Sequence, residues 1–126
     1  MIATISAAGI LPAMPASAAS VSASRTGMSS SMNFNWINSH RWSNGYLSLS
    51  DTAADGDPVK VNIWDGYQLE GTRNNSNGSG TTLTWSGMYF DSGNLSLPFI
   101  YFEGCVVRAL IDDACTNGAR SYNPYA

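Results

Sequence analysis

Charged residues are scarce in this chain of 126 residues, where they make up 12% of the sequence, about half of the usual share. Nine carboxylates outnumber the basic residues, which do not cluster: Arg25, Arg41, Lys60, Arg73, Arg108 and Arg120. Nucleic acids and anionic membrane surfaces are bound through a clustered positive field. The sequence therefore argues against nucleic acid as a partner and predicts no membrane-binding patch.

Histidine and cysteine are nearly absent as well, with His40 as the single histidine and Cys105 and Cys115 as the two cysteines. A zinc site needs about four nitrogen or sulfur ligands, so metal binding through sulfur is not expected. A histidine can act as a general base, but no Gly-x-Ser-x-Gly motif and no free cysteine accompanies His40. We interpret His40 as a surface residue and expect neither an enzyme nor a cofactor.

The first nineteen residues, MIATISAAGILPAMPASAA, contain no charge and are small and apolar. They end on Ala16-Ser17-Ala18, a small-x-small pattern that signal peptidase cleaves. A membrane span needs about 20 uninterrupted apolar residues, and a glycine and two prolines interrupt this segment. We therefore predict that residues 1–18 are a secretory leader that is removed, that no membrane anchor is retained, and that the protein is secreted.

Residues 19–33, ASVSASRTGMSSSMN, are rich in serine and show no clear periodicity. We interpret them as a flexible tail and expect ordered structure to begin near Phe34 or Trp36. The chain after the leader is long enough for one domain. We place this domain at residues 34–126 and expect it to be a monomer.

Alternating apolar residues predict strands in the rest of the chain. Val59, Val61 and Ile63, for example, share one face of a strand over 59–64. Further strands are predicted over 46–50 and 81–90, in the apolar run that starts at Phe99, and as one short closing strand within 119–125; residues 51–58 and 70–80 are predicted loops. Short strands between Gly, Asn and Asp turns are typical of sandwiches and barrels. We predict an all-β fold, a single small antiparallel β-sandwich of six to eight short strands.

Cys105 and Cys115 are expected to form a disulfide, because an even number of cysteines in an exported protein favours one; two free thiols are the alternative. A straight strand over 105–111 would carry the chain about 20 Å away from Cys105. The next four residues could recover only about 14 Å, and disulfide partners need Cα atoms within about 7 Å. Either the chain bends around 109–112 or the strand starts after Cys105, and we favour the bend.

Three carboxylates crowd one predicted turn: Asp51, Asp55 and Asp57. Ca²⁺ prefers clustered oxygen ligands, but the spacing lacks the EF-hand pattern and its closing glutamate. We interpret these residues as turn formers and keep a metal site as the alternative. Glu70 and Glu103 would be the two carboxylates of a glycosidase, an activity that we do not expect because nothing in the sequence brings them together.

Aromatic residues are the strongest candidates for a binding surface. Because side chains alternate between the two faces of the strand over 59–64, Trp64 faces away from Val61 and Ile63, and it lies beside Tyr67 at the strand end. An exposed tryptophan can stack on a sugar ring or anchor a protein partner. We predict ligand binding through Trp64, Tyr67 and Trp42; the alternative is that Trp36 or Trp42 covers this face and makes Trp64 part of the core.

Several segments together carry a resemblance to a known group: the leader ending in PASAA, DTAADGDPVKV (51–61), and a cysteine-bracketed C-terminal segment with Val107-Arg108 and a closing Asn123-Pro124-Tyr125. Over residues 45–125 the chain resembles small exported proteins of actinobacteria. The resemblance implies a β-sandwich and export, and it supplies no activity. The first cysteine of that group follows the Val-Arg pair, near Leu110 here, whereas Cys105 precedes it, so the disulfide register stays open.

Two functions are compatible with these observations. We expect a secreted, non-catalytic binding or structural module that contacts an extracellular ligand, either a glycan such as a polysaccharide or a protein. The alternative is a small secreted effector, a toxin or an inhibitor of a foreign enzyme, that acts through a polar loop within residues 65–80.

Overall fold

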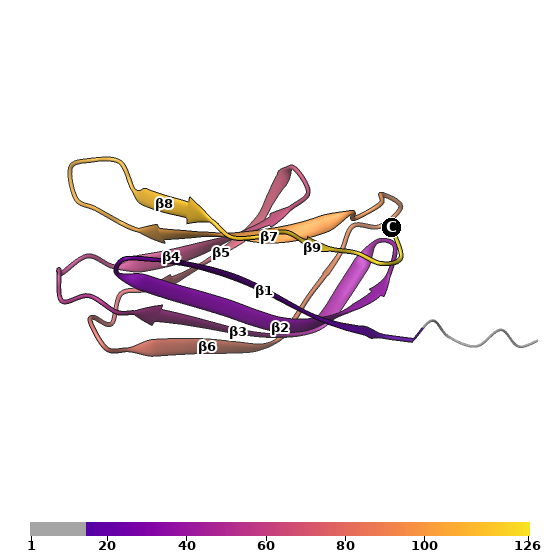
Figure 1. The fold of residues 1–126 in the computed structure, drawn as a ribbon, viewed down its shortest axis with the longest axis horizontal. Helices are drawn as coiled ribbons and strands as arrows, with labels where there is room; N and C mark the ends of the chain where they lie inside the picture. Colours follow the sequence, from indigo (N-terminus) through magenta and orange to yellow (C-terminus); the bar gives the residue numbers. More distant parts are fainter. Residues whose placement is uncertain (1–14) are drawn as a thin grey trace, which may run out of the picture.

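The computed structural model describes residues 15–126. This range forms nine β-strands and no helix, so it contains no helical segment long and apolar enough to cross a membrane. The strands make two antiparallel sheets that pack face to face (Figure 1). The predicted all-β sandwich is confirmed, with more strands than the six to eight expected.

The first sheet has the strand order β1-β2-β3-β6. Its strands are β1 (Ser17–Arg25), β2 (Met28–Asn38), β3 (Arg41–Asp51) and β6 (Thr82–Asp91). The second sheet has the order β5-β4-β7-β8, and β9 also pairs with β7. Its strands are β4 (Val59–Asp65), β5 (Gln68–Asn75), β7 (Phe99–Val106), β8 (Ala114–Asn117) and β9 (Ser121–Tyr122).

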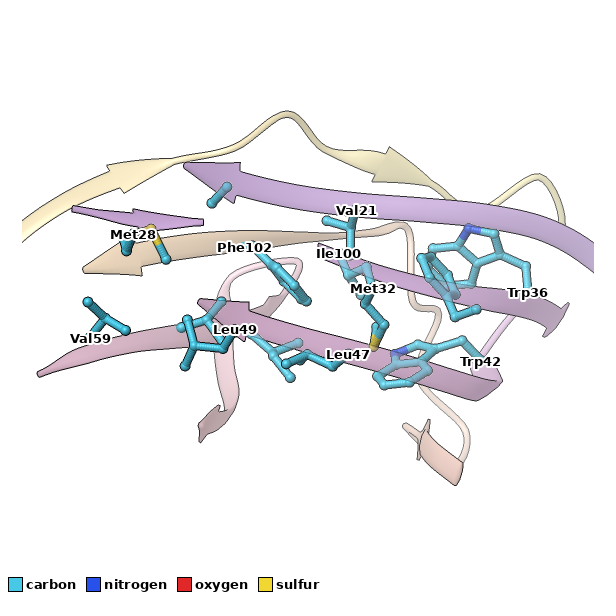
Figure 2. Packing of buried hydrophobic residues seen from close by; sticks show 14 of the residues in the cluster. Val21, Met28, Met32, Trp36, Trp42, Leu47, Leu49, Val59, Ile100 and Phe102 are labelled. Atoms are coloured by element: carbon cyan, nitrogen blue, oxygen red, sulfur yellow. The ribbon is translucent and has the colours of Figure 1, made fainter. Parts of the chain in front are cut away.

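The core fills the space between the two sheets. Val59, Val61 and Ile63 lie on the inner face of β4, as predicted, and are at most 2% exposed. Figure 2 shows the large rings of Trp36 and Trp42 entering the same space from β2 and β3. Burial of such apolar side chains is the main favourable contribution to folding.

The prediction of a flexible tail over residues 19–33 is wrong, because these residues form most of β1 and the first half of β2. The two strands pair along the whole length of β1. Every second side chain is buried, and this set is Val21, Ala23, Met28, Ser30 and Met32. Serine and alanine fill many positions on both faces, and such small side chains obscure the alternation of a strand. The ordered domain therefore includes residues before Phe34.

The predicted leader overlaps the first strand. Residues 1–14, most of the leader, lie outside the described residues. The predicted cleavage point follows Ala18, a residue of β1 that pairs with Asn35 of β2. Cleavage there would shorten β1 and remove the carbonyl of Pro15, which accepts a hydrogen bond from the Tyr125 hydroxyl. Secretion itself stays a prediction.

The first half of the predicted polar loop 70–80 is strand β5. Ile63 pairs with Gly71 and Trp64 pairs with Leu69, so Glu70 between them has no partner on β4. This is a β-bulge, in which two residues of one strand oppose one residue of the other. The bulge turns Glu70 toward the inside, where it lines a small cleft together with Trp42.

The predicted disulfide and the predicted bend are both confirmed. β7 ends at Val106, the chain turns through residues 107–113, and β8 returns antiparallel to β7. Cys105 and Cys115 are directly opposite each other, with Cα atoms 4.1 Å apart, and are joined by the disulfide. The disulfide links β8 covalently to β7 and holds it at the edge of the second sheet.

The two sides of the sandwich differ. On one side β1 passes along β7 and β8 (Figure 1), and Gly118 lies directly against the backbone of Ser22. On the other side β5 and β6 are edge strands that pair with only one neighbour each in the described chain. A cleft lined by Glu70, Arg73 and Met88 separates these two edges.

Candidate functional site

The outer face of the second sheet carries a group of aromatic side chains, which we call the aromatic face: Trp64, Tyr67, Phe99, Tyr101 and Tyr122. Trp64 pairs with Tyr101 between β4 and β7, and Phe99 pairs with Tyr122 between β7 and β9. Directly paired residues of an antiparallel sheet project to the same face. Tyr67, in the β4–β5 turn, joins this group through an edge contact with Phe99.

Phe99 is the centre of the aromatic face. Its ring centroid lies 5.8 Å from that of Tyr67, 5.7 Å from Tyr122 and 6.3 Å from Tyr101. The Trp64 and Tyr101 rings lie 6.1 Å apart with their planes within 5° of parallel. Phe99 is only 5% exposed, whereas Tyr67 is 83% and Tyr122 is 66% exposed. A buried phenylalanine thus supports a rim of tyrosines that solvent can reach.

Polar side chains hold Trp64 in one orientation. Its Nε1 donates a hydrogen bond to Glu103 Oε1 at 3.3 Å, and Asn62 Nδ2 donates to the same oxygen at 2.8 Å. Thr72 Oγ1 in turn donates to Asn62 Oδ1 at 2.7 Å. The Arg120 guanidinium lies 4.2 Å from the Phe99 ring centroid. A ring that is fixed before binding loses less conformational entropy when a ligand arrives.

Two of the three predicted binding residues lie on the aromatic face, and the third does not. Trp64 is half-buried, with its side chain on the face opposite Ile63, and Tyr67 is exposed. The prediction is wrong for Trp42, which is 1% exposed and packs edge-on against Phe34 in the core, 5.6 Å between centroids. The alternative that Trp36 or Trp42 covers Trp64 is also wrong, because both fill the interior from the first sheet.

Sequence reasoning missed the three other members of the aromatic face. Phe99 and Tyr101 lie in an apolar run in which Ile100 and Phe102 are also apolar. A strand that is apolar on both faces shows no alternation, so the outward pair could not be separated from the inward pair. Tyr122 belongs to a strand of two residues, too short for any periodicity.

A groove of ≈ 460 Å³ opens beside Tyr67, between the β4–β5 turn and the connection from β6 to β7. Its polar lining includes Asp65, Gln68 and Asp91, and its apolar lining includes Leu95. Volumes of about 300–1,000 Å³ are usual for small-molecule sites. Tyr67 belongs both to this groove and to the aromatic face, so the two surfaces are continuous.

His40 has a partner that the sequence did not predict. Its Nδ1 lies 2.9 Å from Asp91 Oδ1 at the surface, where the two side chains are 36% and 40% exposed. A catalytic dyad of this kind also needs a nucleophile that contacts the histidine. The neighbouring Ser92 hydroxyl donates instead to the backbone carbonyls of His40 and Leu95. Among the described residues, the pair therefore has no nucleophile in contact with His40.

Two of the three aspartates of the 51–58 turn, Asp51 and Asp55, act as turn formers through their side chains. Asp51 Oδ1 accepts a hydrogen bond from the backbone N–H of Ala53, and Asp55 Oδ1 accepts one from the N–H of Asp57. Such contacts two residues along the chain are typical of aspartate in turns.

One group of potential metal ligands lies close together in the part of the chain that the structure describes. It consists of Glu103, Cys105 and Cys115, whose candidate ligand atoms lie within 4.8 Å of one another. Both sulfur atoms are consumed by the disulfide, and thiolate is the form of cysteine that ligates metals. Glu103 already accepts two hydrogen bonds at Oε1, so this group does not make a metal centre.

Glu70 and Glu103 do not form a carboxylate pair, because they lie on opposite faces of the second sheet. Glu103 is on the outer face beside Trp64, and Glu70 lines the inner cleft beside Trp42. Burial, and to a smaller extent the charge of Asp65, raises the pKa of Glu70 from 4.5 to about 8, while the Trp42 indole opposes the shift. Within the described chain, neither Glu70 Oε2 nor Trp42 Nε1 makes a hydrogen bond of adequate geometry. Burial thus favours the protonated form of this half-buried carboxyl.

No protein-family model, curated protein or solved structure matches this chain. The aromatic face, with its fixed tryptophan and the adjoining groove, is the most developed candidate site among the described residues.

Proposed function

We propose that the protein is a secreted, non-catalytic module that binds a polysaccharide through the aromatic face. The single observation that carries this proposal is the cluster of five aromatic rings on one outer sheet face, two of them largely exposed. Sugar rings present apolar C–H faces that pack on aromatic rings, and their hydroxyl groups need polar partners nearby. Asn62, Thr72 and Glu103 supply such partners beside Trp64.

The chemistry of the surface favours a neutral or cationic glycan over an anionic one. The chain carries a net charge of −3, and the groove that continues the aromatic face is lined by carboxylates. Like charges at an interface oppose association. The effector alternative, which relied on a loop within 65–80, has less support because residues 68–75 of that segment are strand β5.

Binding can be measured by pull-down with insoluble cellulose and chitin and by fluorescence titration with soluble oligosaccharides. Of the four tryptophans, Trp36 and Trp42 are buried and Trp85 packs against the core, so Trp64 is the one on the aromatic face. We expect a ligand-dependent change in tryptophan emission in the wild type. The change is expected to disappear in W64F, while calorimetry still detects weakened binding.

A matched pair of tyrosine variants separates the aromatic face from exposure in general. Tyr67 on the aromatic face and Tyr89 on β6 of the other sheet are both largely exposed, at 83% and 67%. Y67A should lower the affinity roughly three- to tenfold, as expected for loss of one aromatic contact, and Y89A should leave it unchanged. Equal losses in both variants, or no binding to any glycan of a broad panel, would refute the proposal.

A further inference from the structure

The groove beside Tyr67 has polar groups that the fold does not use. Asp65 and Gln68 line it, and neither side chain forms a hydrogen bond or an ion pair with any described residue. Tyr67 forms one wall, and Leu95, which is 70% exposed, lies in the connection that forms the other. An aromatic wall with unused polar side chains is the usual composition of a small-molecule site.

Asp65 is the unusual member of this lining. Its side chain is half-buried at the end of β4, and this burial raises the pKa of its carboxyl. A carboxylate that is withdrawn from water without a partner costs free energy. A ligand that brings hydrogen-bond donors and a positive charge would offset this cost.

Asp91, the other carboxylate of the groove, is already compensated. Its Oδ1 accepts hydrogen bonds from the Gly93 backbone N–H at 2.8 Å and lies 2.9 Å from His40 Nδ1. These contacts, with Arg41 nearby, hold its pKa below the usual value. No basic side chain of the described chain lines the groove itself. The groove is therefore acidic, with Asp65 as the carboxylate available to a ligand.

These features select among ligand classes. An anionic ligand would meet two carboxylates, and a purely apolar ligand would leave Asp65 desolvated without a partner. A primary ammonium group offers three hydrogen-bond donors and a positive charge, which match the carboxylate of Asp65.

We propose that the groove binds the ammonium group of an amino sugar through the carboxylate of Asp65, beside Gln68, its partner across the β4–β5 turn. This inference rests on the proposed glycan binding and names its substrate class, a polysaccharide that carries free amino groups. Because Tyr67 also contacts Phe99 of the aromatic face, one sugar chain can lie on the aromatic face and place a terminal unit in the groove.

Two oligosaccharides of the same length test the proposal: an oligomer of glucosamine and the corresponding oligomer of N-acetylglucosamine, compared by calorimetry at pH 6 and low salt. The acetyl group removes the charge and keeps the sugar backbone. We expect the glucosamine oligomer to bind roughly tenfold more tightly, from the ion pair with Asp65 and its charge-assisted hydrogen bonds. This preference should disappear in D65N, with the affinity for the acetylated oligomer unchanged.

D112N is the matched control, because it removes one negative charge in the turn after β7, at the opposite end of that strand from the groove. It should keep the preference. Y67A, at an exposed position of the aromatic face, should reduce the affinity for both oligomers and keep the preference. D65S should abolish the preference as D65N does and provides a second variant if D65N folds poorly. Equal affinities of the wild type for the two oligomers, or a preference that survives D65N, would overturn the proposal.

The same measurements separate the two proposals. If the acetylated oligomer binds in a Trp64-dependent way without a preference for amines, the groove proposal fails and the aromatic face stands. If free glucosamine binds in an Asp65-dependent way and no oligomer binds more tightly than the monomer, the groove stands and the aromatic face fails as a glycan platform. If no sugar binds, both proposals fail.

Discussion

Asn75 on β5 donates a hydrogen bond from its side-chain Nδ2 to the backbone carbonyl of Leu49 on β3, at 3.1 Å. The same nitrogen donates to the carbonyl of Thr81, also at 3.1 Å, and Asn75 is fully buried. Its Oδ1 accepts from the backbone N–H of Asn77 and from the Thr81 hydroxyl. One buried amide thus joins the two sheets and satisfies four polar groups around it.

Replacing this amide by a carboxyl group should therefore lower the stability of the fold. In N75D a carboxylate oxygen replaces the NH2 group, so the buried Leu49 carbonyl loses this donor, the Thr81 carbonyl retains only the Asp51 N–H, and a charge is placed in the interior. We expect the free energy of unfolding to fall by about 3 kcal/mol, measured by urea denaturation at pH 7. N74D, at the exposed neighbouring position, should change stability by less than about 0.5 kcal/mol. Similar effects of the two substitutions would contradict the bridging role of Asn75.

Asn123 makes the corresponding contact at the C-terminal end of the chain. Its Nδ2 donates to the carbonyls of Asn38 at 2.9 Å and Leu97 at 3.0 Å. Neither asparagine could be identified from the sequence, because asparagine is also common in exposed turns. Their role depends on which carbonyls the tertiary fold brings within reach.

The alternation of residues was sufficient to predict strand β4 of the second sheet and part of the outer face of that sheet. Val59, Val61 and Ile63 alternate with polar residues, and this placed Trp64 correctly on the outside. Trp42 could not be placed in this way, because the polar residues on either side of it resemble a loop, while the structure makes it the second residue of β3.

The first sheet could be predicted only in part. Serine, alanine and methionine in residues 19–33 give a weak contrast between the two faces, and pairing with β3 decides which of them are buried. Ser30, for example, is buried because its hydroxyl donates to the carbonyl of Ser48. The inward turn of Glu70 could not be predicted either, because the bulge that causes it arises from the pairing of β4 with β5.

Gly118 lies so close to the backbone of Ser22 that no side chain fits at position 118. A Cβ on Gly118 would overlap the carbonyl oxygen of Ser22, where β1 passes the connection between β8 and β9. G118A should therefore lower the free energy of unfolding by roughly 2–4 kcal/mol, because one of the two backbones must move. Thermal denaturation monitored by circular dichroism will show this as a lower Tm.

G71A is the control for this substitution. Gly71 lies in a strand, and a Cβ there would meet nothing closer than an Arg73 side-chain nitrogen at 3.8 Å. We expect G71A to be neutral or slightly stabilising, since alanine restricts the unfolded chain more than glycine does. If G118A is as stable as G71A, this result would contradict the close contact between β1 and the β8–β9 connection.

The disulfide should stabilise the fold without determining it. Cys105 and Cys115 are separated by 10 residues, and closing a loop of this size is worth about 3 kcal/mol. The double variant C105A/C115A should be less stable by that amount and should still fold, because β7 also pairs with β4. Wild-type protein in the presence of a reductant should show the same loss. Unfolding of the double variant in buffer would instead make the bridge essential.

The raised pKa of Glu70 predicts an unusual dependence of the free energy of unfolding on pH. Because the pKa of Glu70 is about 8 in the folded protein and 4.5 is its ordinary value, the folded state holds a proton that the unfolded state releases. The stabilisation is complete below pH 4.5 and is lost as the pH rises to about 8, the reverse of a paired carboxylate. E70Q mimics the protonated side chain, so its stability should equal that of the wild type at pH 4 and exceed it increasingly at pH 6.5 and pH 8, as measured by urea denaturation. A difference between the two proteins that is the same at all three pH values would show that the pKa of Glu70 is not raised in the folded protein.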